Sequence, residues 1–155
     1  MQNTLAKEAL KQFRVIFGAV RQHFREIEST CGISGSQLWL LNEIATHPEL
    51  GVSRLAENLS IHQSTCSLLV EKLVKKQLVE KQRSTIDQRK VGLLVTATGH
   101  AVLAKAPQPV DGILPQVLAA MEMDALTNLN SSLGMVVSKL DSQTTALDNH
   151  PLADL

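Results

Sequence analysis

The sequence predicts a mainly α-helical fold with one small β hairpin. Apolar residues recur at three- and four-residue steps over most of the chain, which is typical of amphipathic helices. Two short runs rich in β-branched residues, 79–83 and 91–96, flank a polar, charged stretch, which is typical of a hairpin with a long tip. With 155 residues, 44% of them hydrophobic, the chain is expected to form one domain over 1–155.

The first element expected is a long amphipathic helix over 5–28. A helix of this length extends about 36 Å at 1.5 Å per residue, more than the core of a small domain needs. Part of its apolar face is therefore expected to pack on a second subunit. That face consists of Leu5, Leu10, Phe13, Ile16, Phe17, Val20, Phe24 and Ile27.

Three helices are expected next, at about 36–47, 52–59 and 62–77. Ser34 or Ser36 is suited to cap the first of them, and Pro48 ends it. The second and third are joined by the short connection Ser60-Ile61-His62, whose last residue is also the expected start of the third helix.

After the hairpin, Thr96 or Thr98 is expected to cap a further helix. Pro107, Pro109 and Pro115 should break or kink this helix, because each proline removes a backbone donor and clashes with the preceding turn. A last helix is expected over about 123–140.

The charge of the chain is balanced in total but not along its length. The sequence has 15 Lys and Arg against 15 Asp and Glu. Residues 51–100 hold eight basic and four acidic side chains, whereas 101–155 hold two basic and six acidic ones. A basic middle segment favours an anionic partner for that segment alone.

The order of elements between 52 and 96 is that of a helix-turn-helix unit followed by a β wing. In such units the start of the second helix contacts base edges in the major groove of DNA. Glutamine pairs with adenine, serine and threonine bind base edges or phosphates, and the free N–H groups of the helix start attract phosphate. The candidate DNA contacts here are Ser53, Arg54, His62, Gln63, Ser64, Thr65, Ser67 and Lys72, with Lys75 and Lys76 extending the cationic surface.

The hairpin adds a second candidate DNA contact. It carries Arg83, Asp87, Arg89 and Lys90. Arginine on a β loop is suited to a narrow minor groove, where the negative potential is concentrated. Asp87 is expected to orient Arg89 through a charge-assisted hydrogen bond.

These motifs resemble the MarR family of winged helix-turn-helix transcriptional regulators. The resemblance covers about 10–142 and is carried by Val52-Ser53-Arg54-Leu55-Ala56, Ser64-Thr65, Leu78-Val79, Asp87-Gln88-Arg89 and Thr96-Ala97-Thr98-Gly99. It implies a winged-helix DNA-binding core over about 36–99, with dimerisation helices at about 5–30 and 100–145. It further implies a homodimer that binds a palindromic operator, with the helix matching 62–77 in the major groove and Arg89 in the minor groove.

The chain departs from the family pattern at three places. Gln77 stands where a glycine is usual, and a left-handed residue other than glycine costs about 1 kcal/mol, so the helix end is expected to be shaped differently. Leu68 occupies a position often taken by a small or basic residue, and if exposed it either loses a phosphate contact or reaches a thymine methyl group. The proline group interrupts a helix that is usually continuous.

The resemblance also implies that the regulator is a repressor and that a small aromatic or phenolic effector releases it from DNA. Phe17, Phe24 and Trp39 are the large rings near the junction of the first two helices. Arg14 and Arg21 are suited to pair with a carboxylate there. These five residues are the candidate effector contacts.

Two alternatives stay open. The first is a dimeric ligand- or protein-binding module that no longer reads DNA. The second is a regulator that senses oxidants through Cys31, a thiol in a turn where exposure is plausible. No catalytic pattern is present: no nucleophile stands beside a base, and no glycine-rich phosphate loop occurs. No cofactor or metal is expected, since the histidines form no i, i+4 pair. Neither a membrane span nor a signal peptide is predicted, which favours the cytoplasm.

Overall fold

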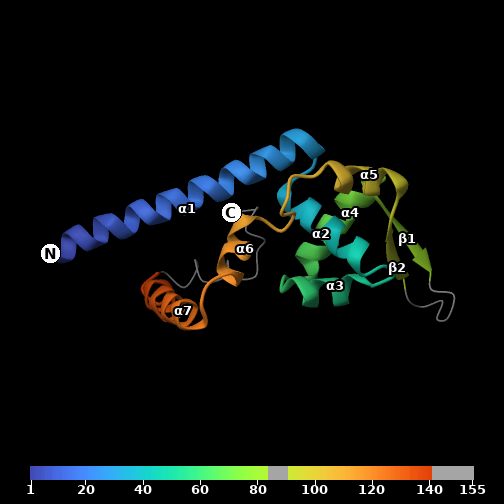
Figure 1. Ribbon diagram of the computed structural model, residues 1–155. Coiled ribbons are helices and arrows are strands. Elements are labelled where there is room, and N and C mark those ends of the chain that lie inside the picture. Colours follow the sequence, from blue (N-terminus) through green and yellow to red (C-terminus); the bar gives the residue numbers. More distant parts are fainter. Residues whose placement is uncertain (84–90, 141–155) are drawn as a thin grey trace.

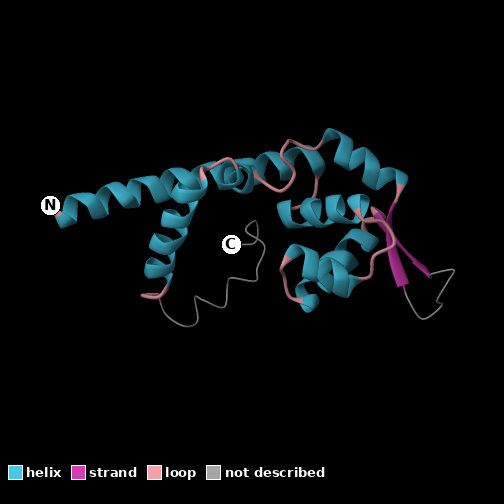
Figure 2. Cartoon of the chain, turned by 60° about the horizontal axis from the view of Figure 1, so that its bottom comes forward, coloured by secondary structure: helices cyan, strands magenta, loops and turns pink. Residues whose placement is uncertain are grey.

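A computed structural model describes residues 1–83 and 91–140 of the chain (Figure 1). The predicted fold class is confirmed, because helices dominate and one antiparallel hairpin interrupts them (Figure 2). In order along the chain, the elements are α1 (Gln2–Cys31), α2 (Gly35–Thr46), α3 (Val52–Leu59), α4 (Gln63–Lys75), β1 (Val79–Arg83), β2 (Val91–Val95), α5 (Ala97–Lys105), α6 (Ile113–Ala119) and α7 (Met123–Val137).

Helix α1 is longer than predicted and projects far from the rest of the chain (Figure 1). Only its last third is buried, at His23, Ile27 and Cys31. The helix ends at Gly32, whose φ of 68° is the left-handed conformation that favours glycine. Half of the apolar face that the sequence predicts on α1 is therefore exposed within one chain, at Leu5, Leu10, Ile16 and Phe17.

The core is centred on α2. Leu38, Leu40, Leu41 and Ile44 are fully buried, and α2 contacts α1, α3, α4, α5 and β2. Ser34 caps this helix: its hydroxyl accepts the N–H of Gln37, while the Gln37 side chain accepts the N–H of Ser34. Because every neighbouring element packs on α2, this helix fixes the position of α4 relative to the hairpin.

The hairpin is held at its base by the segment between α2 and α3. Strands β1 and β2 pair from Val79↔Val95 to Arg83↔Val91. The N–H of Glu49 donates to the Leu93 carbonyl at 3.0 Å, and the N–H of Leu93 donates to the Leu50 carbonyl at 3.2 Å. A Cβ on Gly92 would lie 2.6 Å from the Glu49 carbonyl oxygen, so this close approach requires glycine.

Two of the three prolines that follow α5 act as predicted. Thr96 caps α5 by accepting the N–H of Gly99 at 3.1 Å, and this helix ends before Pro107 and Pro109. Pro115 instead lies in the first turn of α6, where a backbone N–H has no partner within the helix. The prediction that Pro115 breaks a helix is therefore wrong.

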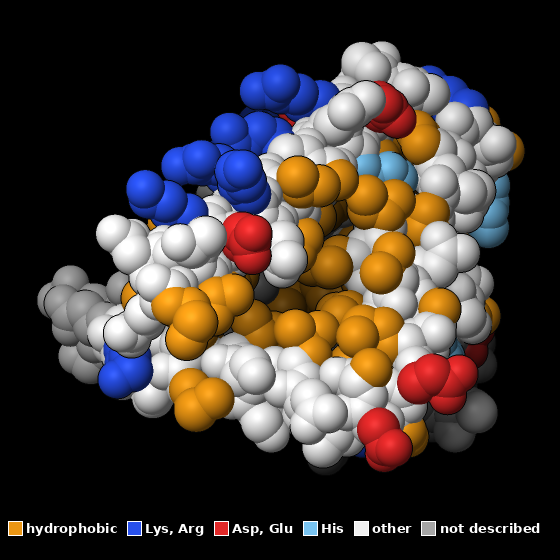
Figure 3. Space-filling view, turned by 60° about the vertical axis from the view of Figure 1, so that its left-hand side comes forward, with side chains coloured by type: hydrophobic (Ala, Val, Ile, Leu, Met, Phe, Trp, Pro, Cys, Tyr) orange, Lys and Arg blue, Asp and Glu red, His pale blue; other side chains and the backbone are white. Residues whose placement is uncertain are grey.

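Helices α6 and α7 have no buried residue within one chain. Figure 3 shows hydrophobic side chains in a hollowed region, with a row of Lys and Arg side chains along one edge. The cations of α1 recur at three-, four- and seven-residue steps and form a stripe beside its apolar face: Lys7, Lys11, Arg14, Arg21 and Arg25. None of the described helices is long and apolar enough to cross a membrane.

Candidate nucleic-acid interface

Helices α3 and α4 are joined by a tight turn that is fixed by backbone hydrogen bonds. Ser60 is left-handed, with φ 54°. Its N–H donates to the Glu57 carbonyl at 3.1 Å, and the N–H of Ile61 donates to the Ala56 carbonyl at 3.0 Å, which is a Schellman motif. Ile61 is buried, so the turn is also anchored by packing.

One face of α4 is buried and the other is exposed. Cys66, Leu69, Val70 and Leu73 form the buried face, as predicted. The helix begins at Gln63, with His62 as its N-cap residue. The predicted base-reading residues differ in exposure: His62, Gln63 and Ser64 are exposed, and Thr65 and Ser67 are half-buried.

The end of α4 keeps a Schellman motif without glycine. Gln77 has φ 60°, its N–H donates to the Val74 carbonyl at 2.9 Å, and the N–H of Leu78 donates to the Leu73 carbonyl at 3.0 Å. The expected change of shape is therefore wrong. The hydroxyl of Thr96 donates to the Gln77 carbonyl at 2.7 Å, which ties the start of α5 to this turn.

The cations near α4 are used in different ways. Arg54 pairs with Glu57 at 2.9 Å, and Lys81 of β1 pairs with Glu71 of α4 at 2.7 Å. The Lys76 amine donates to the Gly32 carbonyl at 3.0 Å, so Lys76 contacts the end of α1 while its side chain stays exposed. Within the part of the chain that the structure covers, Lys72 and Lys75 are exposed and form no salt bridge.

The other predicted contacts lie in α3 and the hairpin. Ser53 is exposed in the first turn of α3. Arg83 is exposed at the end of β1, paired with Val91. Asp87, Arg89 and Lys90 lie outside the described residues, and so does the Asp87–Arg89 hydrogen bond expected from the sequence.

Sequence reasoning missed the pair formed by Glu71 and Lys81. Glu71 is an acid among the lysines of α4, which was a signal in the sequence that it needs a cationic partner. Which cation pairs with it is determined by how the hairpin packs on α4. Leu68, a departure from the family pattern, is 64% exposed. It borders a shallow depression with Glu71, Lys72, Val74 and Lys75.

The candidate effector contacts are divided between the core and the projecting helix. Phe24 and Trp39 are half-buried and pack against the core. Phe17 is 59% exposed and contacts Phe13, with ring centroids 6.1 Å apart. Arg14 and Arg21 are exposed on α1.

Both thiols are buried. Burial raises the pKa of Cys31, and the positive charge of Lys105 only partly opposes this. Burial raises the pKa of Cys66 to about 11. A raised pKa disfavours the reactive thiolate, so the expected exposed, reactive thiol at Cys31 is not what the structure contains.

A short helix, a tight turn, a second helix with a polar exposed face and an antiparallel hairpin together define a winged helix-turn-helix protein. Residues 33–91 match the family model described as the MarR family. The predicted resemblance to the MarR family is thereby confirmed.

Two curated relatives and a solved structure illustrate the similarity. The HTH-type transcriptional repressor MdtR of Bacillus subtilis is 27% identical over 86 residues, 56% of this chain and 56% of that protein. A regulatory protein of Thauera aromatica is 33% identical over 92 residues, 59% of this chain and 55% of its own length. The chain thus spans about half the length of the curated relatives it matches.

The crystal structure of Streptococcus pneumoniae FabT in complex with DNA has the same fold. Its TM-score to this chain is 0.59 at 17% sequence identity, and the match covers 86% of this chain and 95% of FabT.

Proposed function

We propose that this protein is a homodimeric transcription regulator that binds DNA in a sequence-specific manner. The observation that carries the proposal is the exposed face of α4, which presents Gln63, Ser64, Lys72 and Lys75 while the opposite face is buried. A helix held in this way is suited to the major groove. The FabT structure, a protein of the same fold in complex with DNA, supports this placement.

Base reading and phosphate binding fall to different residues in this scheme. Gln63 and Ser64 lie at the start of α4, where side chains reach base edges, and the N–H groups there attract phosphate. Lys72 and Lys75 lie two and three turns further along and bind phosphates without reading sequence. Arg83 brings a cation from the hairpin, and Arg89, further along it, is proposed to enter the minor groove.

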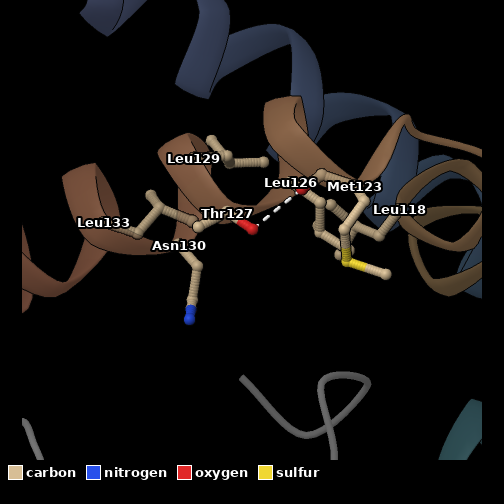
Figure 4. A pocket seen from close by; sticks show the side chains of 7 residues that line it. All are labelled: Leu118, Met123, Leu126, Thr127, Leu129, Asn130 and Leu133. Carbon is tan, nitrogen blue, oxygen red and sulfur yellow. Dashed lines mark hydrogen bonds between the residues drawn. The ribbon is translucent and has the colours of Figure 1, made fainter.

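Exposed apolar surface supports the dimer. Leu5, Leu10 and Phe17 on α1 are each at least half exposed. An apolar depression lies between α6 and α7 (Figure 4), lined by Leu118, Met123, Leu126, Thr127, Leu129, Asn130 and Leu133. Apolar surface on α1 and between α6 and α7 is typical of an interface that a second subunit covers. We therefore assign dimerisation to α1, α6 and α7.

The proposal extends to repression of an operator and release by an effector. MdtR, which this chain resembles over half its length, is described as a repressor. Phe24 of α1 and Trp39 of α2 pack against the core, and Arg14 and Arg21 lie further out on α1. A small aromatic or phenolic acid bound in this region of the dimer would weaken DNA binding if it favoured dimers whose two α4 helices do not match the operator spacing.

Selection and sequencing of DNA bound by the purified protein tests this function. We expect an inverted repeat whose half-sites are about one helical turn apart. If selection enriches no motif, the protein does not read DNA sequence, and a ligand- or protein-binding dimer takes the place of the regulator.

A further inference from the structure

Leu68 is an apolar side chain in the middle of a polar face. It is 64% exposed, whereas the buried face of α4 holds Cys66, Leu69, Val70 and Leu73. At 3.6 residues per turn, Leu68 lies one turn after Ser64 and about two turns before Lys75 on the exposed face. The proposed base-reading and phosphate-binding residues thus lie on either side of it.

Packing within the chain does not explain this leucine. An exposed leucine by itself is common on protein surfaces. Leu68, however, lies beside a depression whose other lining residues include Glu71, Lys72 and Lys75. Any surface that covers this depression must tolerate two cations next to an apolar group.

The major groove of DNA has that combination of properties. Its phosphates attract lysine, and the 5-methyl group of thymine is the apolar feature among the base edges it presents. None of the other three bases presents a methyl group at this edge. An aliphatic side chain between polar contacts therefore discriminates in favour of thymine.

Glu71 does not oppose this placement. Its carboxylate lies on the same face but is paired with Lys81 at 2.7 Å, so the local charge is balanced where phosphates approach. Leu68 is consequently bordered by a neutralised acid and by the exposed amines of Lys72 and Lys75.

We propose that Leu68 is a specificity-determining residue that contacts the methyl group of a thymine in each operator half-site. The proposal rests on the proposed function, since it requires α4 to enter the major groove. It adds to that function the identity of a base and the side chain that selects it.

The experiment replaces each thymine of the selected half-site by deoxyuridine, which removes only the methyl group, and measures affinity by fluorescence anisotropy. At one thymine the wild-type protein should lose about fourfold in affinity, as expected for burial of one methyl-sized group. Leu68→Ala should bind the thymine and deoxyuridine operators equally well. Val15→Ala, a control that shortens an exposed aliphatic side chain on α1, away from α4, should keep the wild-type preference for thymine.

The outcomes separate this proposal from the function on which it rests. If a motif is selected but no deoxyuridine substitution weakens the wild-type protein, Leu68 does not read thymine although the protein reads DNA. If one substitution weakens wild type and Leu68→Ala by the same factor, another residue contacts that methyl group and the proposal is overturned. If no motif is selected, the DNA-reading function itself fails. If Leu68→Ala does not fold, Leu68→Ser replaces it in the experiment. The first of these outcomes is decided by the wild-type protein alone.

Discussion

The Lys81 amine lies 2.7 Å from the Glu71 carboxylate and joins strand β1 to helix α4. Both side chains are partly exposed, at 45% and 66%, so the pair contributes little to the free energy of unfolding. Its effect on DNA binding is expected to be larger, because an unpaired carboxylate on the exposed face of α4 repels phosphates.

We expect Lys81→Met to weaken operator affinity several-fold, more strongly at low salt, where charges are less screened. Lys81→Met combined with Glu71→Gln should recover most of the affinity, since no carboxylate is left unpaired. Titrations of both variants and of Glu71→Gln alone measure the coupling between the two residues. If the single Lys81 variant and the double variant bind the operator equally well, Glu71 does not repel the DNA and Lys81 contributes only its own positive charge.

Gln63 and Lys75 are expected to differ in the kind of DNA contact they make. Gln63→Ala should change which base pairs are preferred at one position of the half-site, because amide groups read base edges. Lys75→Ala should weaken all sequences alike and reduce the slope of log affinity against log salt by about 0.9 for each phosphate that Lys75 neutralises in the wild-type complex. Site selection and salt titrations measure the two effects. A change of base preference in Lys75→Ala would contradict this division.

Gly99 allows the start of α5 to pack on the turn after α4. A Cβ at this position would lie 2.3 Å from the Leu78 carbonyl oxygen, whereas a Cβ on Gly18 meets nothing within 4 Å. Gly99→Ala should therefore lower the free energy of unfolding by about 1–3 kcal/mol through overpacking. Gly18→Ala, the matched control within α1, should raise it by up to about 1 kcal/mol through helix propensity. Urea denaturation compares them, and a neutral Gly99→Ala would show that the backbone adjusts freely.

The hairpin and the helices other than α6 (Ile113–Ala119) could be predicted because local patterns specify them. The apolar periodicity of α4 and the polar, charged stretch between the two short strands set their positions to within about two residues. Ser34 and Thr96 were each one of two capping candidates, and only the backbone conformation distinguished them. Contacts between elements were beyond such patterns: the burial of Cys31 and the bond from Lys76 to Gly32 depend on where α1 ends against the rest of the chain.

The shape of the turn at Gln77 shows why a local energy alone did not decide the structure. The left-handed conformation costs about 1 kcal/mol for glutamine. The turn is nevertheless held by three hydrogen bonds, two from backbone N–H groups and one from the Thr96 hydroxyl. These contacts come from residues distant in sequence as well as near, and together they outweigh the local cost.

Cys66 is expected to make stability depend on alkaline pH. Burial raises its pKa from 9.0 to about 11, so the folded state keeps the proton longer than the unfolded state. Its contribution is fully present below about pH 9 and disappears as the pH rises toward 11, by about 2 kcal/mol in all. Unfolding free energies of wild type and Cys66→Ala, measured between pH 8 and 10.5, should converge as the pH rises. The two proteins differ only at residue 66, so the difference between their pH profiles isolates this thiol. Parallel pH profiles for the two proteins would contradict this assignment.

Phe17 and Val15 offer a matched test of the dimer interface. Both are exposed on the projecting part of α1, by 59% and 72%, but Phe17 belongs to the apolar face and Val15 lies toward the polar side. Phe17→Glu should place a charge in the proposed interface and convert the dimer to a monomer, because burial of an unpaired carboxylate is strongly unfavourable. Val15→Glu should leave the dimer intact. Light scattering during gel filtration gives the mass of each variant, and circular dichroism checks that both retain their helices.

Operator affinity should fall when dimerisation is lost, since one α4 helix then reads one half-site without its partner. A dimeric Phe17→Glu with unchanged operator affinity would remove α1 from the interface and leave α6 and α7 as its elements.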